Sequence, residues 1–270
     1  TPGHVARIES PILAGHLYVG VSSRALADHC LDRQKAWGVV GWPDDELLSA
    51  NRFKAIAMDQ RVMVQIMQAV DAEVPIQQLG ALLVQDPVMV YRLLRMVNSA
   101  AFGLTHEVES IRHALMMLGY DKLKSWLQTA YPSASADKSL HPLRHALHMR
   151  ARLMRGLLDP NSDEELKGEV HLTGTFAHLD QLMKEPLAEL LHQLPIPGRI
   201  FSTLVRHDGP YVAYLDVANA VASPHRVDQV PVVCERSGFG LDEVNRAVIH
   251  LLATARDPAD KTFVAARGLK

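Results

Sequence analysis

From residue 51 onwards, apolar side chains recur at the spacing of an α-helix. The clearest stripe has Val90, Leu93, Leu94 and Val97 at positions i, i+3, i+4 and i+7, which places four apolar side chains on one helical face. We therefore expect a buried helix here, with Leu94 and Val97 in the core.

The same spacing, interrupted by proline and glycine, continues to about residue 255. Prolines stand at most of the joints, where helices begin or end. The pattern predicts an all-α fold, an irregular globule of many helices. The expected helices span 53–70, 76–84, 87–98, 111–118, 121–129, 141–158, 167–183, 186–193, 197–207, 211–222, 226–236 and 241–255.

Several residues mark helix ends. Asp86 followed by Pro87 predicts an N-cap and a proline at the first helical position, where the missing N–H is not needed. Ser110 is the expected N-cap of the helix at 111–118, and Gly119 its C-terminal glycine.

Residues 1–50 follow a different pattern. Short apolar segments alternate with proline and glycine, only 22–36 has helical character, and the turn-forming residues 41–45 suggest a boundary. We predict a small α/β or irregular segment at 1–50, a helical domain at 51–256 and a C-terminal tail at 257–270.

The composition of the chain excludes some classes of function. The chain is 48% hydrophobic and 21% charged, with a net charge of −2 and only two cysteines. A net charge this close to zero does not attract the chain electrostatically to nucleic acid or anionic lipid. No apolar run reaches the ~20 residues of a membrane span. We expect a cytoplasmic protein without nucleic-acid or membrane partners.

Three segments, 82–87, 92–103 and 110–119, together resemble the sequence pattern of HDOD domains. These are helical output domains related to HD phosphohydrolases but lacking their metal ligands. The resemblance continues more weakly at 122–127, 174–182, 191–195 and 209–211, where it is similar to the branch found behind EAL domains. In that branch a degenerate EAL domain precedes the HDOD domain, so the resemblance suggests that residues 1–50 are the final strand–helix–strand portion of such a domain. Because the chain has no Glu-Ala-Leu tripeptide, any EAL-like domain here is a fragment.

The residues that carry this resemblance are interpreted as structural. Asn98 and Ser99 stand where a helix must end, and their side chains can bond to nearby backbone groups. The full set is Asp86, Pro87, Asn98, Ser99, Gly103, Gly119 and Trp126.

An HD phosphohydrolase would need a histidine, a His-Asp doublet and a distant aspartate around divalent metal. The doublet His207-Asp208 falls in an Asp-Gly-Pro turn, the wrong place for two inward-facing ligands. Where the resemblance places the doublet, the chain has His178 and Asp180 separated by a leucine, which turns the aspartate about 100° around a helix.

Histidines also recur upstream at helical spacing. His141, His145 and His148 stand at i, i+4 and i+7, a spacing that could hold zinc, but no cysteine or carboxylate adjoins them. A hydrolase would use His145 or His148 with His178 and Asp180. We expect no metal, no cofactor and no catalytic residue.

Two surfaces are candidates for contacts with a partner. One is the outward face of the helix at 87–98; the other is a cationic stripe that could dock an acidic protein or a phosphate-bearing ligand. The alternative for the stripe is a solvated face paired with neighbouring acids. The first comprises Tyr91, Arg92 and Arg95, and the second Arg144, His148, Arg152 and Arg155.

Nucleophilic catalysis finds no support, because the chain has no G-x-S-x-G elbow. A phosphate-binding P-loop finds none either, because there is no Walker A lysine. The resemblance implies a non-enzymatic output domain that acts through a protein partner, and it suggests a link to cyclic-di-GMP signalling. The alternatives are an HD-type metal phosphohydrolase and a regulator that senses a nucleotide, such as a cyclic dinucleotide, without hydrolysing it.

Overall fold

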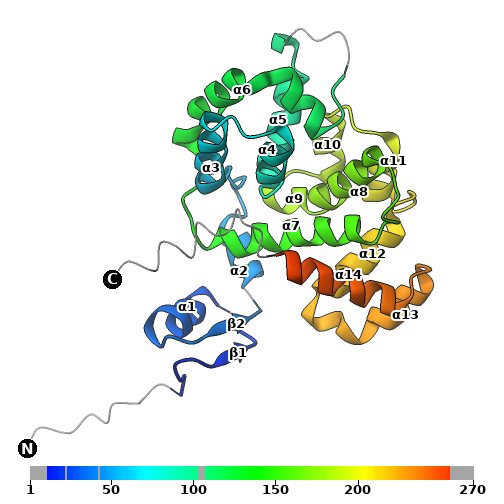
Figure 1. The fold of residues 1–270 in the computed structure, drawn as a ribbon. Helices are drawn as coiled ribbons and strands as arrows, with labels where there is room; N and C mark the ends of the chain where they lie inside the picture. Colours follow the sequence, from blue (N-terminus) through cyan, green and yellow to red (C-terminus); the bar gives the residue numbers. More distant parts are fainter. Residues whose placement is uncertain (1–10, 22, 42, 103–106, 256–270) are drawn as a thin grey trace, which may run out of the picture. The chain divides into compact units, whose positions relative to one another are not determined.

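The structure is a computed structural model that describes residues 11–21, 23–41, 43–102 and 107–255. It divides into two compact units, residues 1–52 with 138–143, and residues 53–137 with 144–270 (Figure 1). The predicted tail at 257–270 lies outside the described residues.

The first unit contains a strand–helix–strand segment, as the sequence predicted. β1 (Leu17–Val19) and β2 (Gly38–Val40) pair in parallel. Between them lie α1 (Arg24–Asp28) and the π-helical turn η1 (His29–Arg33), and α2 (Asp44–Ala50) follows β2. Ser23 Oγ caps α1 by accepting the N–H of Leu26 at 3.2 Å.

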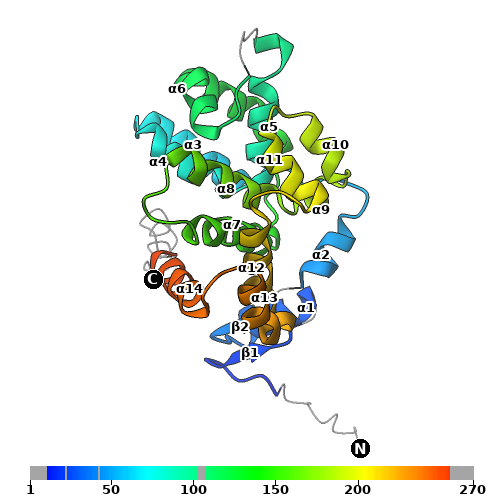
Figure 2. The ribbon, with the colours of Figure 1, turned by 90° about the vertical axis from the view of Figure 1, so that its right-hand side faces the viewer.

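Helices make up the second unit, which confirms the all-α prediction. Their order is α3 (Gln60–Asp71), α4 (Ile76–Leu83), α5 (Pro87–Val97), η2 (Ala100–Phe102), α6 (Ile111–Ala130), η3 (Tyr131–Ser133), α7 (Leu140–Gly156), α8 (Glu164–Phe176), α9 (Leu179–Met183), α10 (Leu187–His192), α11 (Gly198–Phe201), η4 (Ser202–Arg206), α12 (Val212–Ala222), η5 (Pro224–Gln229), α13 (Val230–Arg236) and α14 (Leu241–Thr254) (Figure 2). The first four residues of α7 belong to the first unit.

The core of this unit is built around α5. Its side chains are buried along almost the whole helix, including Leu94 at 1% exposure and Val97 at 0%. Both core predictions are therefore confirmed. The buried arc is wider than the predicted stripe, because α9 also packs on α5, in addition to α6.

The predicted helix ends around α5 and α6 are also confirmed. Asp86 Oδ1 accepts the N–H of Val88 at 3.0 Å with Pro87 at the first position, and Ser110 Oγ accepts the N–H of His113 at 3.2 Å. Gly119 has φ +69° and ψ 177°, so α6 breaks there into two helical segments. Only glycine adopts this backbone conformation without strain.

Asn98 closes the loop that follows α5. Its amide nitrogen donates to the carbonyls of Leu94 and Val108, and its amide oxygen accepts the N–H of Val108 at 2.8 Å. Ser99 Oγ donates to the carbonyl of Met96 at 2.7 Å. These bonds to nearby backbone groups are the structural role expected for both residues.

Four predicted helices differ from the structure. The helix at 53–70 begins only at Gln60, because Asp59 caps α3 and the residues before it are not helical. Residues 167–183 form α8 and α9, broken at Ala177 and His178. In the other two, at 197–207 and 226–236, part of the turn is π-helical or 3-10 helical. Hydrophobic spacing alone does not register these changes of helix type.

Along the described part of the chain, no helix is both long enough and apolar enough to cross a membrane.

Candidate functional site

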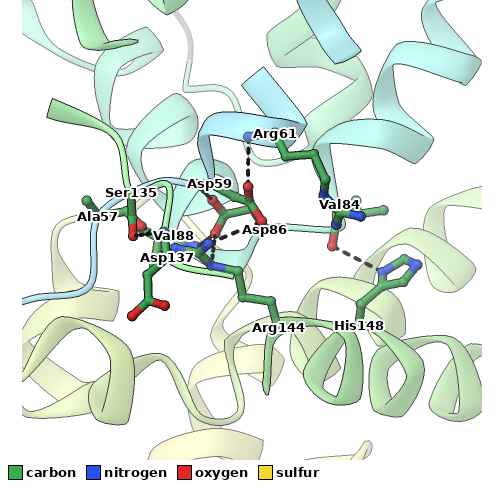
Figure 3. A network of polar contacts seen from close by, with 10 residues as sticks. All are labelled: Ala57, Asp59, Arg61, Val84, Asp86, Val88, Ser135, Asp137, Arg144 and His148. Carbon is green, nitrogen blue, oxygen red and sulfur yellow. Dashed lines mark hydrogen bonds and ion pairs between the residues drawn. The ribbon is translucent and has the colours of Figure 1, made fainter. Parts of the chain in front are cut away.

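Two buried aspartates and one buried arginine join α3, α5 and α7 (Figure 3). Asp86 Oδ2 accepts the backbone N–H of Asp59 at 2.6 Å, and Asp59 Oδ1 caps α3 through the N–H of Arg61 at 2.8 Å. Arg144 on α7 places Nη1 3.2 Å from Asp59 Oδ2 and Nε 3.9 Å from Asp86 Oδ1. Arg144 also donates to the carbonyl of Ala57.

This arrangement corrects the predicted role of Arg144. The side chain is only 2% exposed and faces the two aspartates, so it is not part of a surface stripe. Burial raises the pKa of Asp86, and Arg144 opposes that shift. A buried arginine next to two buried carboxylates stabilises all three charges only while the set is complete.

The helix that carries Arg144 also carries His148, which is partly buried and meets the buried His171 of α8. Gly174 on α8 lies against Ala151 on α7: a Cβ added to this glycine would stand 2.6 Å from Ala151 Cα. Three residues earlier on each helix, the rings of His148 and His171 meet edge to face, with centroids 6.0 Å apart. The close approach of α7 and α8 at Gly174 thus brings the two imidazoles together.

Both imidazoles are neutral near neutral pH. Burial, His171 and Arg152 lower the pKa of His148 to about 3, and burial and Arg155 lower the pKa of His171 to about 4. Nδ1 of His148 lies 3.1 Å from the carbonyl oxygen of Val84 (Figure 3). A carbonyl can only accept, so this nitrogen carries the proton and Nε2 keeps a lone pair.

His171 is 9% exposed, and neither of its ring nitrogens has a hydrogen-bond partner among the residues that the structure describes. The backbone of Ala151 lies near enough to raise its pKa, but not in hydrogen-bonding geometry. Most buried polar groups in proteins are paired. A buried imidazole with both nitrogens unpaired therefore marks a place where a further polar group can bind.

The histidine pair lines a groove of about 1310 Å³ in the second unit. Its walls come from α3, α4, the start of α6, α7 and α8, and apolar side chains such as Ile76, Leu82 and Leu172 lie among the polar ones. This volume exceeds the ~300–1,000 Å³ of a typical small-molecule site. The groove can hold a ligand larger than a single amino acid or sugar.

Three arginines line the groove near the histidines. Arg152 and Arg155 follow His148 along α7, and Arg61 projects from α3. Arg152 Nη2 donates to Thr254 Oγ1 at 2.8 Å, whereas Nε of Arg61 is buried without a hydrogen-bond partner. Arg152 lowers the pKa values of both histidines, and Arg155 lowers that of His171.

The carboxylates that also line the groove are mostly paired. Glu169 is held by Arg199, and Tyr211 Oη donates to its Oε2 at 2.7 Å. Glu164 accepts from Lys167 at 3.0 Å and from Arg155 at 3.4 Å, on a surface where such pairs are weak. The charged groups that lower the pKa of the buried His171 are Arg155 and Arg152.

The residues considered for a metal do not converge. His178 precedes α9, 3.4 Å from Asn219 Oδ1, and burial lowers its pKa; Asp180 lies within α9. His145 lies exposed on α7, at the groove. Among the described residues, no three histidine, cysteine or acidic side chains are grouped so that they could hold a metal ion.

The isolated doublet His207-Asp208 lies in a turn, as expected. His207 ends η4 in the left-handed conformation, and its Nε2 lies 3.3 Å from Asp216 Oδ1. A Cβ at Gly209 would stand 2.1 Å from Thr203 Oγ1, so the turn requires glycine here. The doublet is part of a tight turn.

The predicted outward face of α5 is partly wrong. Tyr91 is 1% exposed, and its hydroxyl donates to Gln193 Oε1 at 3.1 Å, because the chain after α10 covers this side of α5. Arg95 is exposed and Arg92 partly so. Only the two arginines remain as candidates for contact on this helix.

Seven residues carry the resemblance to HDOD domains, and the structure describes six of them. Asp86, Pro87, Asn98, Ser99 and Gly119 cap or close turns, as set out above. Trp126 is partly buried on α6, and Gly103 lies outside the described residues.

Two residues of the site were missed by the sequence interpretation. Asp59 directly precedes a helix and could have been recognised as an N-cap. His171 had no local signal, because a lone histidine in a helix gives no sign of burial or of its partners.

A family model described as "HDOD domain" matches residues 56–149. This segment contains Asp59, Asp86, Arg144 and His148. Over this segment the chain is similar to HDOD domains.

Two curated proteins are similar to the chain. The cyclic di-GMP phosphodiesterase CdgJ of Vibrio cholerae serotype O1 is 27% identical over 187 residues, which cover 68% of this chain and 43% of that protein. The uncharacterized protein YuxH of Bacillus subtilis is 26% identical over 142 residues, which cover 52% of this chain and 34% of that protein. The matched segment thus spans less than half of either relative.

A solved structure shares the fold. The MmoQ response regulator from Methylococcus capsulatus superposes with a TM-score of 0.55 at 16% identity, covering 72% of this chain and 97% of that one. At this identity the likeness concerns the fold alone.

Proposed function

We propose that this chain is a signalling domain that acts through contacts with another protein and does not itself catalyse a reaction. The match of residues 56–149 to the HDOD domain is the observation that carries the proposal. The similarity to a protein named cyclic di-GMP phosphodiesterase supports a place in cyclic-di-GMP-linked signalling.

The geometry around His178 supports a non-catalytic role. A metal phosphohydrolase needs several histidine and carboxylate ligands around one point, and His178 instead lies beside the neutral amide of Asn219. The exposed Arg95 and the partly exposed Arg92 on α5 are the surface we assign to the protein partner, since arginine is enriched where interfaces are strongest.

Two measurements test the proposal with the 270-residue chain. The first offers cyclic di-GMP and a generic phosphoester with Mg²⁺, Mn²⁺ or Ni²⁺; we expect both to remain intact. Turnover that disappears in His178→Ala would overturn the proposal in favour of a hydrolase.

The second measurement captures partners from native lysate on the immobilised chain. We expect a retained protein that is lost when Arg92 and Arg95 are both changed to glutamate. Arg246→Glu, an exposed arginine on α14, is the matched control and should retain it. Equal retention by both variants would remove α5 as the contact surface.

A further inference from the structure

We propose that the groove beside His148 and His171 is a nucleotide-binding site. The inference adds a small-molecule ligand to the proposed signalling domain and does not depend on which protein that domain contacts. It stands on the groove itself, on two sets of unpaired buried polar atoms that line it, and on the arginines around them.

The first unpaired group is the imidazole of His171, which is 9% exposed with neither nitrogen hydrogen-bonded. A neutral imidazole offers one donor and one acceptor. The edge of a nucleobase presents donors and acceptors side by side and can satisfy both. A buried polar group without a partner costs free energy, so a ligand that pairs it gains binding free energy.

The second unpaired atom is Nε of Arg61, on the α3 wall of the same groove. Across from it, Arg152 and Arg155 project from α7, one turn and two turns beyond His148. Arginine recognises phosphate through paired N–H groups. The groove therefore combines phosphate-binding donors with a base-pairing imidazole, which is the pairing of chemistries that a nucleotide requires.

The existing partners of these arginines permit this assignment. The guanidinium of Arg152 is oriented by Thr254 Oγ1 at 2.8 Å, without a carboxylate. Arg155 meets Glu164 at 3.4 Å, with both side chains about half exposed or more. A ligand phosphate can replace this weak surface pair at little cost.

The groove is also large enough and suitably lined. Its volume of about 1310 Å³ accommodates a mononucleotide or a dinucleotide. The apolar side chains Ile76, Leu82 and Leu172 provide surfaces against which a base and its sugar can pack.

Isothermal titration calorimetry on the 270-residue chain tests the proposal. The probes are AMP, GMP, 3′,5′-cyclic AMP, 3′,5′-cyclic GMP, cyclic di-AMP and cyclic di-GMP, with inorganic phosphate as the fragment. We expect at least one nucleotide to bind at one site per chain with a Kd below about 1 mM, and phosphate alone to bind at least about a hundredfold more weakly.

Variants locate the site. Arg155→Gln and His171→Phe should each weaken the binding of that nucleotide by about tenfold or more, and Arg246→Gln should leave it unchanged. Circular dichroism checks folding; if His171→Phe does not fold, Arg155→Gln and Arg61→Gln decide. In NMR spectra of the unaltered chain, the ring protons of His171 should shift as the nucleotide is added.

Three results would overturn the proposal: no nucleotide of the panel binding with a Kd below about 1 mM, binding that is unchanged in the groove variants, or phosphate binding as tightly as the nucleotide. The last result would reduce the groove to a simple anion site. None of these outcomes bears on partner capture through α5, so the two proposals fail separately.

Discussion

Asp86 Oδ2 accepts the backbone N–H of Asp59, 27 residues earlier in the chain, at 2.6 Å. The same carboxylate caps α5 through its other oxygen. One buried side chain therefore satisfies two backbone donors on two elements, and Arg144 balances its charge.

We predict that Asp86→Ala is far more damaging than the loss of an ordinary cap. The substitution removes the bonds to the N–H groups of Asp59 and Val88 and weakens the compensation of Arg144, so the free energy of unfolding should fall by about 3–5 kcal/mol. Urea unfolding followed by circular dichroism measures it. Ser110→Ala, which removes an exposed cap on α6, is the control and should cost about 1 kcal/mol; similar losses in the two variants would contradict the role of the cluster.

Leu94→Ala should destabilise the second unit by about 2–5 kcal/mol, because it leaves a cavity in the buried face of α5. Its neighbour Arg95 is exposed, and Arg95→Ala should change the free energy of unfolding by less than about 0.5 kcal/mol. Thermal and urea unfolding of the two variants side by side would show whether the buried face is assigned correctly.

Two glycines of α8 provide a matched pair. Gly174→Ala should destabilise the protein by about 1–3 kcal/mol, because the new methyl group would stand 2.6 Å from the backbone of Ala151. Gly168→Ala meets nothing within 4 Å and should be neutral or stabilising by up to about 1 kcal/mol. Equal effects of the two substitutions would mean that α7 and α8 are not in close contact at Gly174.

Acidification should weaken the folded state before most carboxylates titrate. The pKa values of His148 and His171 are lowered to about 3 and about 4, whereas both histidines in the unfolded chain have a pKa of about 6.5. Between these values the unfolded state binds protons that the folded state does not. The contribution to stability is thus complete above about pH 6.5 and declines as pH falls toward 4.

Urea unfolding at about pH 7.5 and about pH 5 measures this dependence. The double variant His148→Phe/His171→Phe lacks both groups and should show a smaller decrease over the same interval. The same decrease in the variant and the unaltered chain would show that other groups are responsible.

Local signals in the sequence were sufficient for much of the fold. The i, i+3, i+4, i+7 spacing identified α5 and its core residues, and Asp86, Ser110 and Gly119 identified helix ends, because capping and left-handed backbone depend on one residue and its neighbours. The parallel strand–helix–strand segment was likewise indicated by short apolar runs.

Tertiary packing decided what the sequence could not. Tyr91 and Arg144 were both expected at the surface, yet each is buried by elements distant in the chain, the first by the residues after α10 and the second by the N-termini of α3 and α5. Burial of His171 depends on the approach of α7 to α8 at Gly174, which no periodicity within α8 reveals.

The Asp59–Asp86–Arg144 cluster also constrains how this domain can diverge. Replacing any one of the three residues leaves the remaining buried charges without a partner, so single substitutions are selected against. A joint replacement of all three by apolar residues can be tolerated. Among HDOD domains with this cluster, the three positions should therefore covary, although 85 residues separate the first from the last.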